Sequence, residues 1–239
     1  MLLYIIRHGE PVYNPNGLTQ MGQEQAEAIA KRLSLHGIDK IYASPLKRAR
    51  MTAEPLAKLL NKEVIIEEFM CEEKAGESFC VKDEKGEDKW MFLIEKYRRE
   101  MQSKRILDLG DKWYNHQVFN TPKCKSGYER ILNESDRFLS ELGYVHDREN
   151  GWYKATAPND LRVAAFCHGG FGLSWLGILL NIPLPTVWTK MDISHSGMTV
   201  IEFKEDSQGI CIPKMLMLSN DSHLYREGLP TKYNNEKFI

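Results

Sequence analysis

Two arginines and two histidines stand out in this sequence because each lies at or near the end of a short apolar run. Arg7 and His8 follow the apolar residues 2–6, His168 follows a second such run, and Arg48 comes just after a third. A neutral imidazole is a competent nucleophile, and arginines bind phosphoryl oxygens through a fork of N–H donors. Brought together, these side chains would suit the transfer of a phosphoryl group.

Such a reaction also needs a carboxylic acid that protonates the leaving oxygen and then activates water. Glu72 and Glu73 follow the predicted strand at 63–69, and Glu72 is the better fit, although the sequence does not separate the two. We expect no metal and no cofactor, because cationic side chains can stabilise the phosphoryl charge. The sequence contains no Walker A loop, HExxH motif or EF-hand loop.

The elements that position these residues follow an alternating pattern. Strands alternate with helices that begin after Thr19 and near Ser44-Pro45, which is typical of a parallel sheet covered by helices. The predicted strands lie within residues 2–6, 38–44, 63–69, 161–170, 198–203 and 211–218, with the last two forming a hairpin. We expect an α/β three-layer sandwich with a mostly parallel sheet and helices on both faces. The candidate residues then meet beyond the carboxyl ends of the strands, where such sheets bind ligands.

The domain organisation is predicted to be a single unit spanning residues 1–239. Residues 72–153 are polar, aromatic and irregular, which indicates a cap-like insertion over the sheet. Residues 10–18 contain two prolines, two asparagines and a glycine, and are predicted to form a loop.

Composition limits the partners. The net charge of −1 gives no argument for a nucleic-acid partner, and no apolar run is long enough for a membrane span. The five cysteines are scattered without a CxxC pair, so we expect no disulfide framework and no zinc site, and a reducing cytoplasm. The oligomeric state cannot be read from the sequence.

Four motifs resemble those of a known family, the histidine phosphatase superfamily, which includes cofactor-dependent phosphoglycerate mutase. They are RHGEPVYN (7–14), LTQMGQEQA (18–26), YASPLKRARMTAE (42–54) and FCHGG (166–170). They occur in the order of the family, and the resemblance extends over nearly the whole chain.

The resemblance implies roles for individual residues. His8 resembles the nucleophile that becomes phosphohistidine, and Arg7, Arg48 and His168 match the phosphate pocket. Asn14 matches an asparagine that also touches phosphate in the family.

The neighbouring sequence suggests roles for the other candidate residues. Gly169 follows His168 and suits close approach of a helix N-terminus to a ligand. His195 precedes a strand and is interpreted as structural, and His116 is a candidate pocket residue. Cys167 is expected to be a buried small residue rather than a nucleophile. The aromatic side chains of the insertion are expected mainly in the core, with one or two lining the entrance: Trp90, Trp113, Tyr114 and Phe119.

The resemblance departs from the mutases at two places. The segment between the RHG motif and the helix after Thr19 is shorter here, and FMCEEKAGES replaces a NERHYG-like segment. We therefore expect a metal-independent phosphatase that hydrolyses a small phosphomonoester through phosphohistidine on His8. We also expect the second ring nitrogen of His8 to donate to a backbone carbonyl. The alternatives are mutase-type phosphoryl transfer and a non-catalytic protein that binds phosphorylated ligands.

Overall fold

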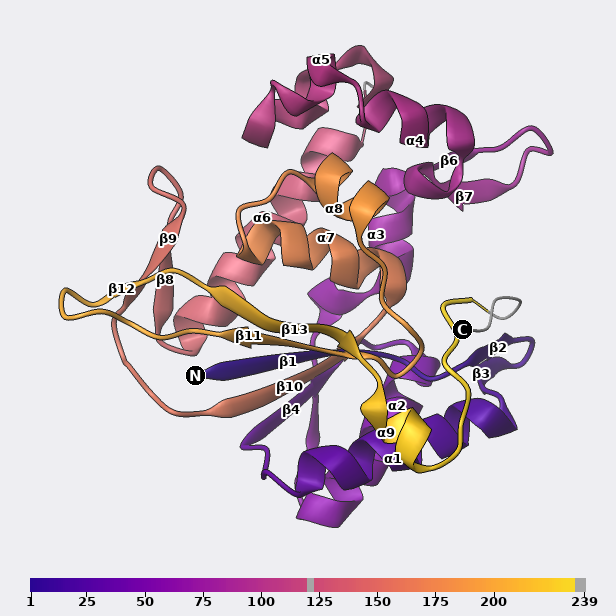
Figure 1. The fold of residues 1–239 in the computed structure, drawn as a ribbon, viewed down its shortest axis with the longest axis vertical. Coiled ribbons are helices and arrows are strands. Elements are labelled where there is room, and N and C mark those ends of the chain that lie inside the picture. Colours follow the sequence, from indigo (N-terminus) through magenta and orange to yellow (C-terminus); the bar gives the residue numbers. More distant parts are fainter. Residues whose placement is uncertain (120–122, 235–239) are drawn as a thin grey trace.

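The central element is a six-stranded sheet in the order β13-β11-β1-β10-β4-β5 (Figure 1). The computed structural model describes residues 1–119 and 123–234. Strands β1, β10, β4 and β5 are parallel to one another. Strand β11 is antiparallel to β1, and β13 is antiparallel to β11, so β13 again runs in the direction of β1. The strands are β1 (Leu2–Arg7), β4 (Lys40–Ala43), β5 (Val64–Ile66), β10 (Arg162–Cys167), β11 (Met198–Glu202) and β13 (Lys214–Asn220). The predicted mostly parallel sheet is confirmed.

Helices cover both faces of this sheet (Figure 1). One face carries α1 (Gln20–Ser34), α2 (Lys47–Leu60) and α9 (Ser222–Arg226). The other carries α3 (Glu72–Phe79), α6 (Cys124–Glu141), α7 (Gly169–Leu179) and α8 (Leu184–Lys190). The three layers agree with the predicted sandwich.

Strand β1 shows why its sequence is apolar without alternation. Leu3 and Ile5 belong to one buried cluster, whereas Tyr4 and Ile6 belong to the other. Successive side chains of a strand point to opposite faces, and helices cover both faces here. The continuous run therefore fixes β1 in the middle of the sheet.

The insertion shares the main core. After α3 come a hairpin, short helices, α6 and a second hairpin, and the ring of Phe138 in α6 packs 4.9 Å from that of Tyr42 in β4. The remaining elements here are β6 (Cys80–Lys82), β7 (Asp88–Trp90), α4 (Glu95–Met101), α5 (Lys104–Leu107), β8 (Tyr144–Asp147) and β9 (Trp152–Ala155). Strand β12 (Ile210–Cys211) pairs with β9. Short 3₁₀ helices cover Glu68–Met70, Met91–Leu93, Gly110–Asn115 and Gln117–Phe119.

Two local predictions are wrong. Residues 10–18 form a small hairpin of β2 (Pro11–Tyr13) and β3 (Asn16–Leu18) rather than a loop, because only Asn14 and Pro15 lie in the turn, whereas the other turn-forming residues are in the paired strands. Helix α2 begins at Lys47, after Pro45 rather than with it. Thr19 does act as the predicted N-cap, and its side chain accepts a hydrogen bond from Gly22 N.

No helix of the described residues is long and apolar enough to span a bilayer.

Candidate active site

His8 lies at the carboxyl end of β1 with 4% of its surface exposed. Its Nδ1 atom is 2.7 Å from the carbonyl oxygen of Gly9. Because a carbonyl only accepts, Nδ1 carries the proton and Nε2 bears the lone pair, as expected from the sequence. Burial holds the pKa of His8 well below its ordinary value, and the nearby His168 and arginines lower it further. His8 is therefore a neutral imidazole whose unprotonated nitrogen, Nε2, carries the nucleophilic lone pair.

Arg7 precedes His8 and is held by backbone oxygens. Its Nη1 atom donates to the carbonyls of Ile193, at 2.6 Å, and Tyr233, at 2.7 Å. Its Nη2 atom lies 3.0 Å from Nε2 of His195. Its Nε atom is buried and has no hydrogen-bond partner among the described residues. One edge of the guanidinium is thus fixed by the protein while Nε remains available.

Arg48 reaches the same place from the first turn of α2. Its Nε atom donates to Nε2 of His8 at 3.2 Å, and its guanidinium lies 5.7 Å from the ring centre of Tyr13. Asn14 follows Tyr13 at the exposed tip of the β2–β3 hairpin. Within the described residues, no hydrogen bond joins the Asn14 side chain to Arg48 or His8.

His168 ends β10 and is fully buried. Its Nε2 atom is 2.7 Å from the hydroxyl of Ser44, and that hydroxyl accepts from Leu46 N at 3.3 Å. A hydroxyl can donate one hydrogen bond while it accepts another, so Ser44 can donate to Nε2, and in that tautomer the ring proton of His168 is on Nδ1. Burial, followed by the two arginines, holds the pKa of His168 well below its ordinary value. Its ring centre is 5.0 Å from that of His8.

The two adjacent glutamates, Glu72 and Glu73, differ in burial and in hydrogen bonding. Glu72 begins α3, and its carboxylate oxygens accept from Gly170 N at 3.0 Å and Phe171 N at 2.7 Å. Burial raises the pKa of Glu72, although these two N–H groups and the arginines oppose the rise. Glu73 is exposed to solvent. The structure therefore brings Glu72, and not Glu73, to the first turn of α7 beside the histidines.

Unpaired donors mark where a ligand would lie. Nδ1 of His168 and Nε of Arg7 are both buried without a partner in the described part of the chain. A Cβ atom on Gly169 would lie 3.4 Å from the guanidinium carbon of Arg7, so the start of α7 lies in van der Waals reach of this guanidinium. Buried donors are almost always paired, which indicates that an anionic ligand completes this set.

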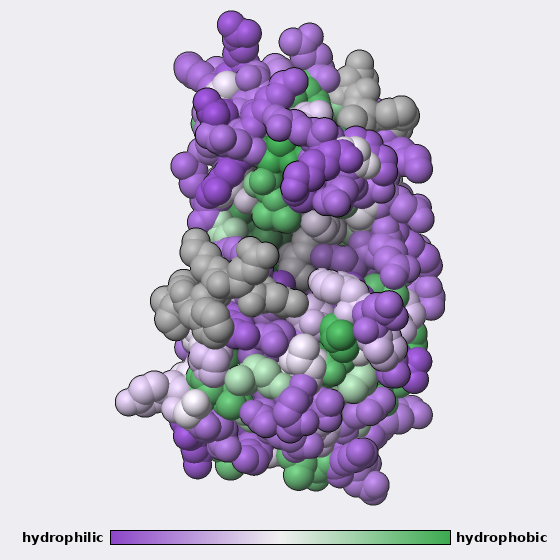
Figure 2. Space-filling model, turned by 90° about the vertical axis from the view of Figure 1, so that its right-hand side faces the viewer, coloured by the Kyte–Doolittle hydropathy of each residue, from purple (hydrophilic) through white to green (hydrophobic). Residues whose placement is uncertain are grey.

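The site lies on the side of the molecule that Figure 2 faces. This side is the one to which β1 and β10 run in Figure 1, and it is hollowed about half-way up. Hydrophilic side chains surround much of the hollow.

His195 is a site residue that the sequence interpretation missed. Its ring centre lies 6.0 Å from that of His8, and it contacts Arg7 directly. The strand that it precedes, β11, is antiparallel to β1, so the start of β11 meets the end of β1. The predicted hairpin of 198–203 with 211–218 did not fix the direction of β11 relative to β1, so the sequence held no signal that placed His195 here.

Other candidates lie elsewhere. His116 sits in a 3₁₀-helical part of the insertion, 3.9 Å from Glu100. Trp113 and Phe119 are buried in the core, as expected, and Trp90 and Tyr114 pack against it. Cys167 is fully buried and its pKa is raised by burial, which agrees with a packing role.

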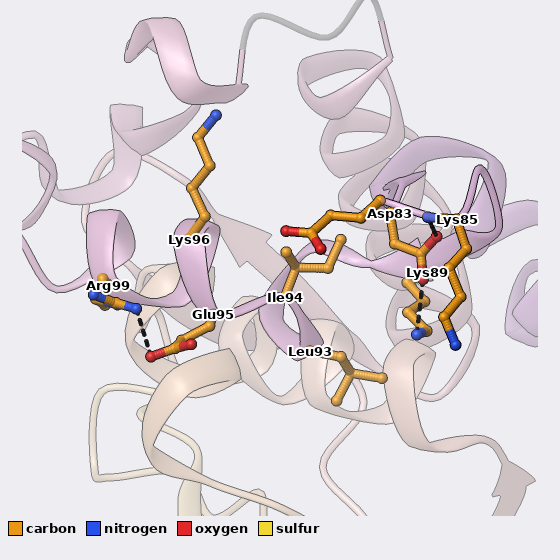
Figure 3. A pocket seen from close by; sticks show the side chains of 9 residues that line it. Asp83, Lys85, Lys89, Leu93, Ile94, Glu95, Lys96 and Arg99 are labelled. Carbon is orange, nitrogen blue, oxygen red and sulfur yellow. Dashed lines mark hydrogen bonds and ion pairs between the residues drawn. The ribbon is translucent and has the colours of Figure 1, made fainter.

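A surface pocket of about 620 Å³ lies in the insertion rather than at the strand ends. Figure 3 shows that its lining is charged and largely self-paired: Asp83 contacts Lys89, and Arg99 contacts Glu95. None of the candidate catalytic residues lines it. Across residues 1–119 and 123–234, no group of three or more His, Cys, Asp or Glu side chains could hold a metal ion.

Comparison with known proteins decides the family. The profile of the histidine phosphatase superfamily (branch 1) matches residues 3–211. The chain belongs to this superfamily. The resemblance seen in the sequence motifs is thereby confirmed.

Relatives of this histidine phosphatase include hydrolases and mutases. It is 25% identical over 211 residues to a putative phosphoserine phosphatase 2 of Hydrogenobacter thermophilus, covering 84% of this chain and 89% of the relative. It is 36% identical over 153 residues to a 2,3-bisphosphoglycerate-dependent phosphoglycerate mutase of Thermoplasma acidophilum, covering 59% and 74%. A solved phosphoserine phosphatase of Entamoeba histolytica, in complex with 3-phosphoglyceric acid, has 22% identity and a TM-score of 0.58 over 93% of this chain and 98% of that one. This last likeness confirms the fold, and the phosphatases agree with the expected hydrolase.

Proposed function

We propose that this histidine phosphatase hydrolyses small phosphomonoesters through a phosphohistidine formed on Nε2 of His8. One observation carries the proposal: a neutral His8 with its lone pair on Nε2 lies among buried donors that have no partner of their own. A phosphoryl group has the oxygens that these donors lack. The residue roles below rest on this arrangement.

Binding begins with the phosphate group. Its oxygens accept from Nε–H of Arg7 and Nδ1–H of His168. Arg48 currently donates to Nε2 of His8, and a phosphoryl oxygen would compete for that donor. Once Arg48 turns to the phosphate, the lone pair of His8 faces phosphorus.

The first chemical step transfers the phosphoryl group. A bond forms between Nε2 of His8 and phosphorus while the bond from phosphorus to the leaving oxygen breaks. Glu72 in its protonated form donates its proton to that oxygen, and the raised pKa of Glu72 increases the population of this form. The arginines stabilise the charge on the transferring group.

The second step reverses the role of Glu72. Its carboxylate takes a proton from a water molecule, the resulting hydroxide oxygen bonds to phosphorus, and the bond from phosphorus to His8 breaks. Inorganic phosphate leaves, and both His8 and Glu72 regain their starting protonation states.

The substrate is proposed to be a small phosphorylated metabolite. Phosphoserine and 3-phosphoglycerate are the first compounds to assay, because relatives are named for, or were solved with, such molecules. A screen of phosphorylated metabolites for phosphate release would rank them. The cytoplasmic location and the lack of a nucleic-acid partner stay predictions from the sequence.

The test is hydrolysis of p-nitrophenyl phosphate by His8→Ala over a range of pH. We expect turnover to fall at least about 1,000-fold, because loss of a nucleophile removes the covalent route. His36→Ala, which removes an exposed histidine, serves as the control and should keep wild-type turnover. Wild-type protein should also form an acid-labile phosphoenzyme that His8→Ala lacks. Undiminished turnover in His8→Ala would refute the mechanism.

Mutase-type transfer is the second candidate, because several relatives are named as phosphoglycerate mutases or probable phosphoglycerate mutases. Product analysis with 3-phosphoglycerate and its bisphosphate primer separates the two activities. We expect free phosphate, and accumulation of the isomer would favour the mutase. Binding of phosphate esters without any trapped phosphoenzyme would instead favour the non-catalytic alternative.

A further inference from the structure

His195 is a buried histidine whose place is tightly defined. It is 1% exposed and lies in the turn before β11. Its N–H donates to the carbonyl of Lys232 at 2.8 Å. The next residue, Ser196, has a positive φ of 56°, and its N–H donates to the carbonyl of His8 at 3.2 Å. This backbone hydrogen bond holds the turn against the carboxyl end of β1, where the site lies.

The contact between His195 and Arg7 has one possible direction. A guanidinium only donates, so Nε2 of His195 accepts from Nη2 of Arg7 across their 3.0 Å separation. The neutral ring therefore carries its proton on Nδ1. Burial, with further contributions from Arg7 and Lys232, lowers the pKa of His195 to about 3, so the ring stays an acceptor at neutral pH.

Arg7 consequently has little freedom. The carbonyls of Ile193 and Tyr233 take both hydrogens of Nη1, and His195 takes one hydrogen of Nη2. The hydrogen on Nε and the second hydrogen on Nη2 form one edge of the guanidinium, and that edge is the part left for a ligand. Without His195, the guanidinium of Arg7 would lose the hydrogen bond that holds Nη2 and keep the two that hold Nη1.

We propose that His195 is a positioning residue that sets the guanidinium of Arg7 in the orientation that receives the phosphate. It acts through Arg7 and forms no bond to the substrate. This inference rests on the proposed function, because it concerns the same phosphate pocket. It predicts that the acceptor atom, rather than the volume of the side chain, matters for phosphate binding.

The experiment compares two amides at this position. In His195→Gln the amide oxygen can reach the place of Nε2, whereas in His195→Asn it reaches only the place of Nδ1. We measure the inhibition constant of inorganic phosphate and the separate kcat and KM values for p-nitrophenyl phosphate. His195→Asn should weaken phosphate inhibition about 10- to 100-fold and raise KM, since a hydrogen bond to a charged group is lost. His195→Gln should stay within about threefold of wild type.

A matched control removes a half-buried histidine contact away from the site. Nδ1 of His146 contacts Asp136 at 2.8 Å, and β8, which carries His146, lies at the opposite end of the sheet from the site in Figure 1. His146→Gln, whose amide cannot reach the place of Nδ1, should lower the melting temperature and leave KM and phosphate inhibition unchanged.

The outcomes separate the two proposals. Equal phosphate inhibition in wild type, His195→Asn and His195→Gln would overturn the role of His195 while leaving the phosphatase intact. An equal loss in both variants would also overturn it, because it would mean that the ring as a whole, and not its acceptor, is required. A wild-type protein that neither releases phosphate nor forms a phosphoenzyme would contradict the proposed function itself.

Discussion

At the scale of single residues, Glu72 and Glu73 show how position within one helical turn decides chemistry. Neighbouring positions on a helix are rotated by about 100°, so only one of the two carboxylates can face α7. Glu72 accepts two backbone hydrogen bonds there, and Glu73 is in solvent. The sequence could not separate them because both follow the same strand and have the same chemistry.

The first prediction concerns this pair. Glu72→Gln should lower kcat/KM for phosphoserine by about 100- to 10,000-fold, because an amide cannot donate the acidic proton that an alkoxide leaving group needs. The loss with p-nitrophenyl phosphate should be much smaller, since p-nitrophenolate leaves without a proton. Glu73→Gln is the control and should keep wild-type kinetics with both substrates. Equal losses on the two substrates would show that Glu72 does not act as the acid.

A second prediction follows from the protonation states. The pKa of His8 is well below its ordinary value of 6.5, so kcat/KM should not decline as the pH falls from 8 to 6. On the alkaline side the rate should decrease as Glu72 loses its proton, at a pH above the usual 4.5 for this carboxyl. The profile of kcat/KM for phosphoserine checks both limbs. The remaining activity of Glu72→Gln should lack the alkaline limb; its persistence would assign that limb to another group.

The site residues that could be predicted from the sequence are those that belong to a recognisable motif. Arg7, His8 and His168 end strands whose apolar runs are visible, so their meeting point could be predicted. His195 has no such signal in its own segment, because its contact depends on the antiparallel return of β11 beside β1. Asn14 was expected at the phosphate from the motif alone, and the structure places it at an exposed hairpin tip.

At the scale of elements, the segment that follows β1 packs closely against the first turn of α1 at two glycines, Gly9 and Gly22. A Cβ atom on Gly22 would lie 2.2 Å from the carbonyl oxygen of Glu10, and one on Gly9 would lie 2.5 Å from the carbonyl oxygen of Gly22. Both carbonyl oxygens belong to the backbone, so no side-chain rotation could relieve the clash. The first turn of α1 is therefore in direct contact with the segment that follows His8.

The third prediction uses this contact. Gly22→Ala should lower the free energy of unfolding by about 1–3 kcal/mol and reduce turnover, because α1 must move away from the segment after His8. Gly76→Ala is the matched control, since Gly76 also lies within a helix but its added Cβ would meet only Cys80 Sγ at 3.5 Å. It should be neutral or stabilising by up to about 1 kcal/mol, as expected for alanine in a helix. Chemical denaturation measures both, and equal effects would remove the argument from close packing.

Strands and helices could be predicted where the spacing of apolar residues agrees with capping or turn residues at the ends of the element. The strand of residues 2–6 and the cap at Thr19 have both signals, and the structure contains them. The hairpin at 10–18 was not predicted because prolines and asparagines are typical of loops. Its formation depends on the pairing of β2 with β3, which composition does not reveal. The short helices of the insertion depend on packing against α8 and α6, which no local pattern records.

At the scale of the whole molecule, the fold buries several neutral histidines. His8 and His168 have pKa values well below the ordinary value, and burial lowers the pKa of His195 to about 3 and that of His223 to about 4. In the unfolded chain these rings take up protons below pH 6.5. Between pH 6.5 and 4 the unfolded state thus binds protons that the native state does not, so stability falls as the pH falls. Glu72 has the opposite sign, because its raised pKa lets the native state bind a proton first.

The last prediction isolates one of these histidines. Each ring that stays neutral in the native state contributes a slope of about 1.4 kcal/mol per pH unit below pH 6.5. His223 is buried, contacts Ser196 through Nε2 at 2.9 Å, and has no direct contact with the other three. His223→Asn should therefore reduce the slope of unfolding free energy against pH by about 1 kcal/mol per unit between pH 6 and 4.5, because over this range the unfolded chain holds most of one proton that the folded ring lacks. Urea denaturation at several pH values measures the slope, so a uniform loss of stability in the variant does not obscure it. An unchanged slope in His223→Asn would mean that His223 takes up its proton in the folded state, and burial would then not be what controls its charge.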